Sequence, residues 1–181
     1  ASLDLRSCKA LQGAHNHQNA CAAYAAVRTL GIGPHSVEKA LKSFTGLAHR
    51  SQLVTELSGV VFINDSKATN VDSAMKALET FAKVRWICGG EQKEEDISRL
   101  NNVLTNVEKA YVIGTDAAKF SSQISCEFEI CNTMDIAVKK AFNDAKDGET
   151  VLLAPAAASF DQYSSFEERG KDFEQEIEKL V

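Results

Sequence analysis

The sequence predicts an α/β fold with a Rossmann-like, mostly parallel sheet that carries helices on both faces. From residue 60 onward, short apolar runs alternate with longer stretches whose apolar side chains recur at helical spacing. Strands that alternate with helices in this way are typical of a largely parallel sheet covered on both sides. The residues before this region follow a helical pattern only, which indicates a separate and smaller helical part.

The first part of the chain is predicted to form two helices. An alanine-rich stripe at helical spacing marks the first helix, which Gly31 and Gly33 end. Pro34 then opens the second helix. The stripe consists of Ala20, Ala23, Tyr24, Val27 and Leu30. The character of the sequence changes after Arg50, and we therefore place a domain boundary near residue 52, which gives residues 1–52 and 53–181.

Beyond this boundary the pattern predicts alternating strands and helices. A strand-like stretch surrounds Ser58 and Gly59, and the alternation proper follows it. In chain order we expect a strand at 60–63, a helix at 71–81, a strand at 84–88, a helix at 97–104, a strand at 110–113, a short helix at 117–124, a strand near 128–130, a helix at 134–145, a strand at 150–153 and a final helix at 166–180.

Composition and charge exclude several classes of function. The 181 residues carry a net charge of −5 with a pI near 5.4 and no basic run, which argues against nucleic acid or an anionic membrane surface as a partner. No stretch approaches the ~20 apolar residues of a membrane span, and no signal peptide is recognisable, so we expect a cytoplasmic protein without membrane insertion. Five cysteines without Cys-x-x-Cys spacing indicate reduced thiols. The chain begins at Ala1 rather than at Met, which suggests a fragment.

Four predicted strand-to-helix loops carry most of the polar chemistry. In an open parallel sheet such loops lie at one edge, where ligands bind, so distant segments are expected to meet there. The four loops are 65–70, 89–93, 114–116 and 154–161.

The side chains of these loops suit a small anion. Lys67 and Lys93 offer positive charges, Thr69 and Ser159 offer hydroxyls, and the pair Gly89-Gly90 allows a close backbone approach. A substrate that carries a carboxylate is the expected ligand. Taken singly, each of the two lysines is better explained as a solvated surface residue, and Ser159 has the alternative role of shaping a turn.

The loop at 65–70 is the densest of the four in polar groups. Thr69 with Asp72 fits a capping box, which would place the free N–H groups of the next helix over the loop and favour an anion there. Asp65 has the alternative role of a helix-entry cap.

Other polar groups point to less specific chemistry. His15 and His17 have no partner at metal-ligand spacing, so no zinc site is expected. Arg50 beside His49 either forms a structural pair or binds a phosphate. No Gly-x-x-x-x-Gly-Lys-Ser/Thr motif occurs, and no Gly-x-Gly-x-x-Gly follows a strand, so the chain carries no phosphate loop of its own.

Six motifs in order and spacing resemble those of the Mur ligase family, from about residue 13 to the C-terminus. They are His15-Asn16 with Asn19, Phe44-x-Gly46-Leu47-x-His49-Arg50, Asn64-Asp65-Ser66-Lys67-Ala68-Thr69-Asn70, Gly89-Gly90-x-x-Lys93, the run from Leu152 to Tyr163, and Phe166-Glu167-x-Arg169-Gly170. The chain is most similar to the family member that joins D-glutamate to UDP-N-acetylmuramoyl-L-alanine. It departs from the usual pattern at Ala154 and Ala157, where Ser and Cys are common, and at Tyr163, where Phe is common.

The resemblance implies a three-domain enzyme of peptidoglycan precursor synthesis. Its N-terminal domain holds the UDP sugar, its central domain carries the phosphate loop, and its C-terminal domain is Rossmann-like. Residues 1–52 would be the helical end of the central ATP-binding domain and residues 53–181 the ligase domain, so the chain alone is expected to be inactive. In this family ATP phosphorylates the substrate carboxylate, Mg²⁺ neutralises phosphate charge, and the amine of D-glutamate attacks the acyl phosphate.

The resemblance also implies roles for individual residues. Asn16, Asn19, Arg50 and Asp65 match positions that bind ATP, on its adenine, phosphate and ribose sides. The positions that match D-glutamate contacts are Lys67, Thr69, Lys93, Ser159 and the backbone around Phe166. No catalytic residue or metal ligand is assigned, because those of the family lie outside this chain. Two alternatives stay open, a stand-alone nucleotide-binding or interaction module and a Mur ligase for another amino acid.

Overall fold

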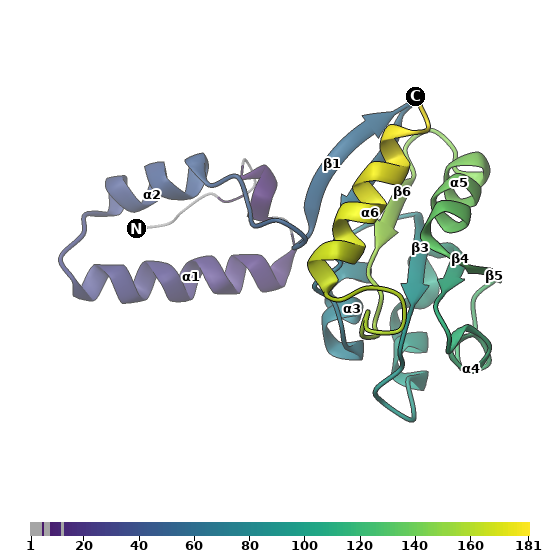
Figure 1. Cartoon of the computed structure of the whole chain (residues 1–181). Helices are drawn as coiled ribbons and strands as arrows, with labels where there is room; N and C mark the ends of the chain where they lie inside the picture. Colours follow the sequence, from purple (N-terminus) through teal and green to yellow (C-terminus); the bar gives the residue numbers. More distant parts are fainter. Residues whose placement is uncertain (1–4, 6–7, 12) are drawn as a thin grey trace. The chain divides into compact units, whose positions relative to one another are not determined.

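The computed structural model describes residues 5, 8–11 and 13–181, and their contacts divide the chain into two compact units, Ala1–Leu47 and Ala48–Val181 (Figure 1). The division lies a short way ahead of residue 52, where the first strand, β1 (Gln52–Leu57), begins.

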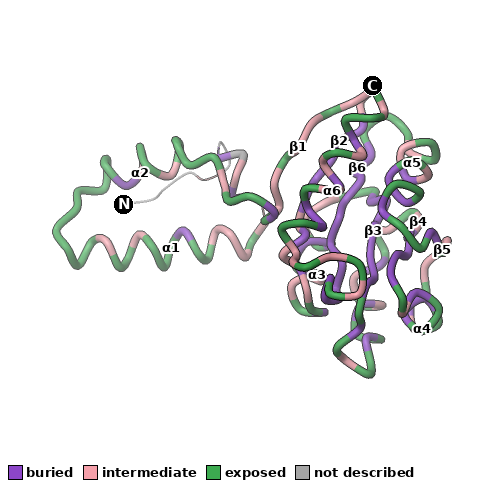
Figure 2. The backbone as a smooth tube through the Cα atoms, viewed as in Figure 1, coloured by how far each residue is buried: buried purple, intermediate pink, exposed green. Residues whose placement is uncertain are grey.

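The first unit consists of helices that bury little surface. It contains a short 3-10 helix, η1 (Lys9–Leu11), followed by α1 (Ala14–Thr29) and α2 (Pro34–Ser43). Ala20 is the buried residue of α1 and Val37 that of α2, and Figure 2 shows most of both helices as exposed. A small apolar cluster joins Cys8, Leu11 and Ala20. The predicted helices are present. Of the predicted alanine-rich stripe, Ala20 is buried, Tyr24 and Val27 are half-buried, and Ala23 and Leu30 are exposed.

The second unit is built on a six-stranded sheet with the order β1-β2-β6-β3-β4-β5. Its further strands are β2 (Val60–Asn64), β3 (Val84–Gly89), β4 (Val107–Ile113), β5 (Phe128–Asn132) and β6 (Thr150–Leu153). All neighbouring strands are parallel except β1 and β2, which form an antiparallel hairpin. Ser58 and Gly59, both with positive φ, make its two-residue turn, as the twist of a hairpin requires.

Helices cover both faces of this sheet (Figure 1). One apolar cluster packs α3 (Val71–Leu78), α4 (Ala117–Ser121) and the 3-10 helix η2 (Ser98–Asn106) on one face, and a second packs α5 (Met134–Asp144) and α6 (Phe166–Glu178) on the other. Successive strand residues point to opposite faces: Trp86 and Cys88 join the first cluster and Ile87 the second. The predicted fold class, a mostly parallel Rossmann-like sheet with helices on both faces, is confirmed. Within the described part of the chain, no helix has the length and hydropathy needed to cross a membrane.

The segment predicted as a helix over 97–104 differs in type, since η2 is a 3-10 helix. Its Asn101 side chain accepts a hydrogen bond from Ser125 N at 2.8 Å and donates one to Gln123 O at 3.0 Å. These bonds attach the segment to the loop after α4, and three asparagines give it a weak α-helix propensity. The hydrogen bonds of Asn101 to this loop therefore favour a 3-10 helix over the regular α-helix that the apolar spacing predicts.

Candidate functional site

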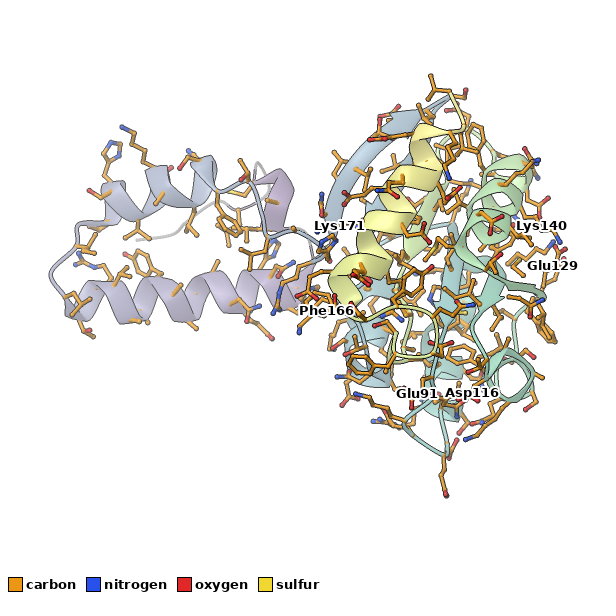
Figure 3. All side chains as sticks on the ribbon, viewed as in Figure 1. Glu91, Asp116, Glu129, Lys140, Phe166 and Lys171 are labelled. Atoms are coloured by element: carbon orange, nitrogen blue, oxygen red, sulfur yellow. The ribbon has the colours of Figure 1, made fainter. Side chains whose placement is uncertain are left out.

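The four polar loops meet at one edge of the sheet, as their positions after parallel strands require. They follow β2, β6, β3 and β4, which are consecutive neighbours in the sheet. Backbone hydrogen bonds tie them together, from Ala156 N to Ala68 O and from Gly89 N to Pro155 O, both at 2.9 Å. Glu91 and Asp116 mark this edge in Figure 3. We refer to these loops together as the carboxyl-edge site.

Two lysines of the site are available to an anion. The Lys67 ammonium lies 4.0 Å from the ring centroid of Phe166, and that of Lys93 lies 5.8 Å from the ring of Phe160. Within the described residues, neither lysine pairs with a carboxylate. Aromatic rings hold these ammonium groups without neutralising their charge, so the site keeps two positive charges for a ligand.

Two hydroxyls accompany the lysines. Ser159 is 2% exposed, and its carbonyl accepts hydrogen bonds from Gln162 N and Tyr163 N, which fixes the turn around it. Thr69 lies in the β2 loop, where its N–H bonds to Lys67 O at 2.8 Å. Across the described chain, neither hydroxyl has a protein hydrogen-bond partner, so both are able to donate to a carboxylate.

The N-terminus of α3 differs from its prediction. Asn70, not Thr69, is the N-cap, and its side chain accepts from Ser73 N at 2.9 Å. The Val71 N–H donates to the Glu94 carboxylate at 3.2 Å. The predicted capping box is therefore wrong, and so is the helix-cap alternative for Asp65. Because the chain's own Glu94 occupies this helix end, a bound anion depends on the lysines instead.

Asp65 lies at the end of β2 in an unusual electrostatic environment. Burial raises the pKa of its carboxyl to about 6, although Ser51 and Arg50 both act to lower it. Ser51 Oγ lies 3.4 Å from Asp65 Oδ2. Asp65 thus lies beside the exposed Arg50, which places two of the four residues expected to bind ATP close together.

The other two residues expected to bind ATP, Asn16 and Asn19, lie on α1 in the first unit. They are three residues apart, so their side chains leave the same side of the helix.

One residue of the site, the buried Arg169 of α6, belongs to one of the six motifs, but the sequence assigned it no role. Its guanidinium donates to Ser66 and to the carbonyls of Ala157 and Ala158. A signal was present in the spacing of Phe166, Arg169-Gly170, Phe173 and Ile177, because Arg169 falls on the apolar stripe that the helix buries.

Among the residues that the structure describes, no group of three or more His, Cys, Asp or Glu side chains is placed so that it could hold a metal ion.

A parallel α/β sheet with cationic and hydroxyl groups at its carboxyl edge defines a Rossmann-like domain suited to a small anionic ligand. Residues 49–157, more than half of the chain, match the family of the Mur ligase, glutamate ligase domain. The chain therefore belongs to the Mur ligase family.

Individual relatives agree with this assignment. The UDP-N-acetylmuramoylalanine–D-glutamate ligase of Ruegeria pomeroyi is 60% identical over 180 residues, which are 99% of this chain and 39% of that protein. The chain thus spans well under half the length of this curated relative, and it corresponds to the C-terminal portion.

Two solved structures share the fold. A pseudomurein peptide ligase type C from Methanothermus fervidus has a TM-score of 0.70 and 19% identity, covering 93% of this chain and 36% of that chain. The MurF ligase from Thermotoga maritima, in complex with ADP, has a TM-score of 0.67 and 18% identity, covering 93% of this chain and 40% of that chain. At these identities the comparison establishes the fold alone.

Proposed function

We propose that this chain is the C-terminal portion of an ATP-dependent ligase that joins D-glutamate to UDP-N-acetylmuramoyl-L-alanine. Residues 1–52 would complete a central ATP-binding domain, and residues 53–181 would form the ligase domain that receives the amino acid. The relative from Ruegeria pomeroyi carries the name of this activity. The reaction belongs to peptidoglycan precursor synthesis, and we place it in the cytoplasm, where ATP is available.

The observation that carries the proposal is the set of unpaired donors on neighbouring loops. Lys67 and Thr69 follow β2, Lys93 follows β3, and Ser159 follows β6, the strand that lies between them. D-Glutamate has two carboxylates, and the two ammonium groups with the two hydroxyls supply donors for both. The α6 start at Phe166 adds an aromatic wall against Lys67.

The ATP side of the proposed site is assigned to Asn16, Asn19, Arg50 and Asp65. Arg50 would contact a phosphate and Asp65 the ribose hydroxyls, while the two asparagines would contact the adenine. Mg²⁺ would be held by residues outside this chain and would neutralise phosphate charge. The solved MurF structure contains ADP, which agrees with nucleotide use in the family.

The proposed chemistry has two steps. A carboxylate oxygen of UDP-N-acetylmuramoyl-L-alanine attacks the γ-phosphorus of ATP, and ADP leaves. The amine of D-glutamate then attacks the acyl carbon, inorganic phosphate leaves, and the amine loses a proton. The residues of the carboxyl-edge site hold and orient the amino acid, so that its amine meets the activated carbon.

Substrate dependence in the full-length enzyme tests the proposal. With ATP and UDP-N-acetylmuramoyl-L-alanine, we expect phosphate release only when D-glutamate is added, and none from residues 1–181 alone. The measurement is phosphate release with D-glutamate, L-glutamate or a diamino acid. Equal turnover with a diamino acid would favour a Mur ligase for another substrate, and nucleotide binding without turnover would favour a stand-alone module.

Lys93→Ala adds a site-specific arm to this test. Loss of a charge-assisted bond to a carboxylate is expected to raise the KM for D-glutamate by about tenfold or more, with little change in the KM for ATP. Lys171→Ala is the matched control, because Lys171 is an exposed lysine of α6 outside the four loops (Figure 3). Equal effects of Lys93→Ala on both substrates would reject the role given to Lys93.

A further inference from the structure

Arg169 is a buried cation that the proposed chemistry does not use. Its residue is 1% exposed, and among the described residues no carboxylate forms an ion pair with it. Burial lowers the pKa of its guanidinium to about 10, which leaves it protonated at neutral pH. The charge of the Asp161 carboxylate acts to raise this pKa, but it forms no ion pair with Arg169. An arginine that is buried in this way and has only neutral hydrogen-bond acceptors requires another explanation.

All acceptors of the guanidinium lie in two of the four loops. Nε donates to Ser66 Oγ at 3.1 Å and Nη2 donates to Ser66 O at 3.0 Å. Nη1 donates to the carbonyls of Ala157 and Ala158, each at 3.2 Å. The planar fork of the guanidinium therefore joins the loop after β2 to the loop after β6.

Two of the three contacted residues directly precede a residue assigned to D-glutamate. Ser66 precedes Lys67, and Ala158 precedes Ser159. The Ser66 hydroxyl, which accepts from Arg169, donates in turn to Phe166 O at 2.8 Å. One guanidinium thus connects three segments that carry proposed substrate contacts.

The loop that carries Lys93 is attached to the same point. Ala158 O accepts from Glu91 N at 3.0 Å, and Ala158 N donates to Glu91 O at 2.9 Å. A Cβ on Gly90 would lie 2.2 Å from Ala158 O and 3.3 Å from Arg169 Nη1, so the backbone passes too closely here for any side chain.

We propose that Arg169 is a positioning residue for the amino-acid substrate, a clamp that sets the distance between the Lys67 loop and the Ser159 loop. This inference deepens the proposed function and rests on it. The desolvation of an unpaired cation is unfavourable for folding, and in return the carbonyls of two loops are held in one fixed geometry. Lysine carries the charge but lacks the fork, so charge and geometry can be separated by substitution.

The test uses Arg169→Met and Arg169→Lys in the full-length enzyme. With Arg169→Met we expect the KM for D-glutamate to rise at least about tenfold, the equivalent of about 1.4 kcal/mol of binding free energy, and the KM for ATP to change less than about threefold. Three of the four proposed ATP contacts lie outside the clamped loops. Arg169→Lys should give an intermediate rise. Amide hydrogen exchange should become faster in residues 66–69 and 157–161.

Arg85→Met provides the matched control. Among the described residues, Arg85 is the other buried arginine. It lies near the amino end of β3, away from the four loops, and pairs with Glu149 at 2.7 Å. We expect this variant to lower the melting temperature while both KM values and loop exchange stay unchanged.

Several results would overturn the clamp. One is a rise in the D-glutamate KM with Arg85→Met that equals the rise with Arg169→Met. Another is an equal change in the KM values for ATP and D-glutamate with Arg169→Met. A third is amide hydrogen exchange in the two loops that Arg169→Met leaves unchanged. If Arg169→Met does not fold, Arg169→Lys decides by the same readouts. If the unmodified enzyme does not use D-glutamate at all, the proposed function fails, and loop exchange alone still decides whether Arg169 joins the loops.

Discussion

At the scale of single residues, burial changes the chemistry of Asp65 most clearly. Its pKa of about 6 lies above the ordinary value of 3.8 because desolvation outweighs the hydrogen bond from Ser51 and the charge of Arg50. In the folded protein the carboxyl therefore keeps its proton to a higher pH than in the unfolded chain. Stability consequently decreases as the pH rises from about 4 to about 6, and the ionised form at neutral pH is unfavourable.

Asp65→Asn should therefore stabilise the fold. Near pH 7 we expect the free energy of unfolding to increase by up to about 3 kcal/mol, because each pKa unit corresponds to about 1.4 kcal/mol. The gain should shrink toward zero below about pH 3, where the carboxyl is largely protonated in both the folded and the unfolded state. Urea unfolding followed by the fluorescence of Trp86, the chain's single tryptophan, measures it. A loss of stability near pH 7 would mean that the Ser51 bond outweighs desolvation.

The same substitution tests a conflict between stability and function. If Asp65 contacts the ribose as proposed, the stabilised Asn variant should bind ATP more weakly in the full-length enzyme. A carboxylate that lowers the stability of the fold is expected at positions where it contacts a ligand.

Residue-level features divide into those that spacing predicts and those that it does not. Lys67, Lys93 and Ser159 could be placed at one edge from the sequence, because each follows an apolar strand. The cap Asn70 could not be distinguished from Thr69, since both side chains suit the position and the choice depends on where α3 starts. The role of Arg169 could not be predicted, because its hydrogen-bond acceptors are distant in sequence. Ser66 lies 103 residues before it and Ala157 lies 12 residues before it.

At the scale of elements, the close contact between the β3 and β6 loops depends on Gly90. Its φ of 131° is one that residues with a side chain rarely adopt, and Ala158 O occupies the space of a Cβ. The two hydrogen bonds between Glu91 and Ala158 require this approach.

Gly90→Ala should therefore be much more costly than a glycine replacement in open space. We expect it to lower the free energy of unfolding by about 3 kcal/mol or more through backbone strain and steric clash. Gly148→Ala is the control, because Gly148 has a φ of 80° but no neighbouring atom lies within 4 Å of the place that a Cβ would take, and about 1–2 kcal/mol is expected there. Urea unfolding measures both. Equal losses would show that the clash with Ala158 is relieved without cost.

The order of elements was predictable, and their neighbours in the sheet were not. Each parallel strand is a short apolar run, so its position followed from composition and spacing. The placement of β6 between β2 and β3 is set by long-range packing that no local pattern encodes. The helix type of η2 likewise depends on the bonds of Asn101 to a later loop.

At the scale of the whole chain, the two units differ in the apolar surface they bury. The second unit has a large cluster on each face of its sheet, whereas the described cluster of the first unit centres on Cys8, Leu11 and Ala20. Isolated helices of this length are marginal in water without packing. The first unit should therefore be the less stable part of the chain.

We accordingly expect residues 1–181 to unfold in two steps. In urea, far-ultraviolet circular dichroism should lose the signal of α1 and α2 first, while Trp86, buried in the second unit, reports only the later step. Leu41→Ala, beside the small cluster, should shift only the first step, and Val138→Ala, on the buried side of α5 with 0% exposure, only the second. Coincident transitions by both probes would contradict this prediction, because they would mean that residues 1–181 unfold in one cooperative step.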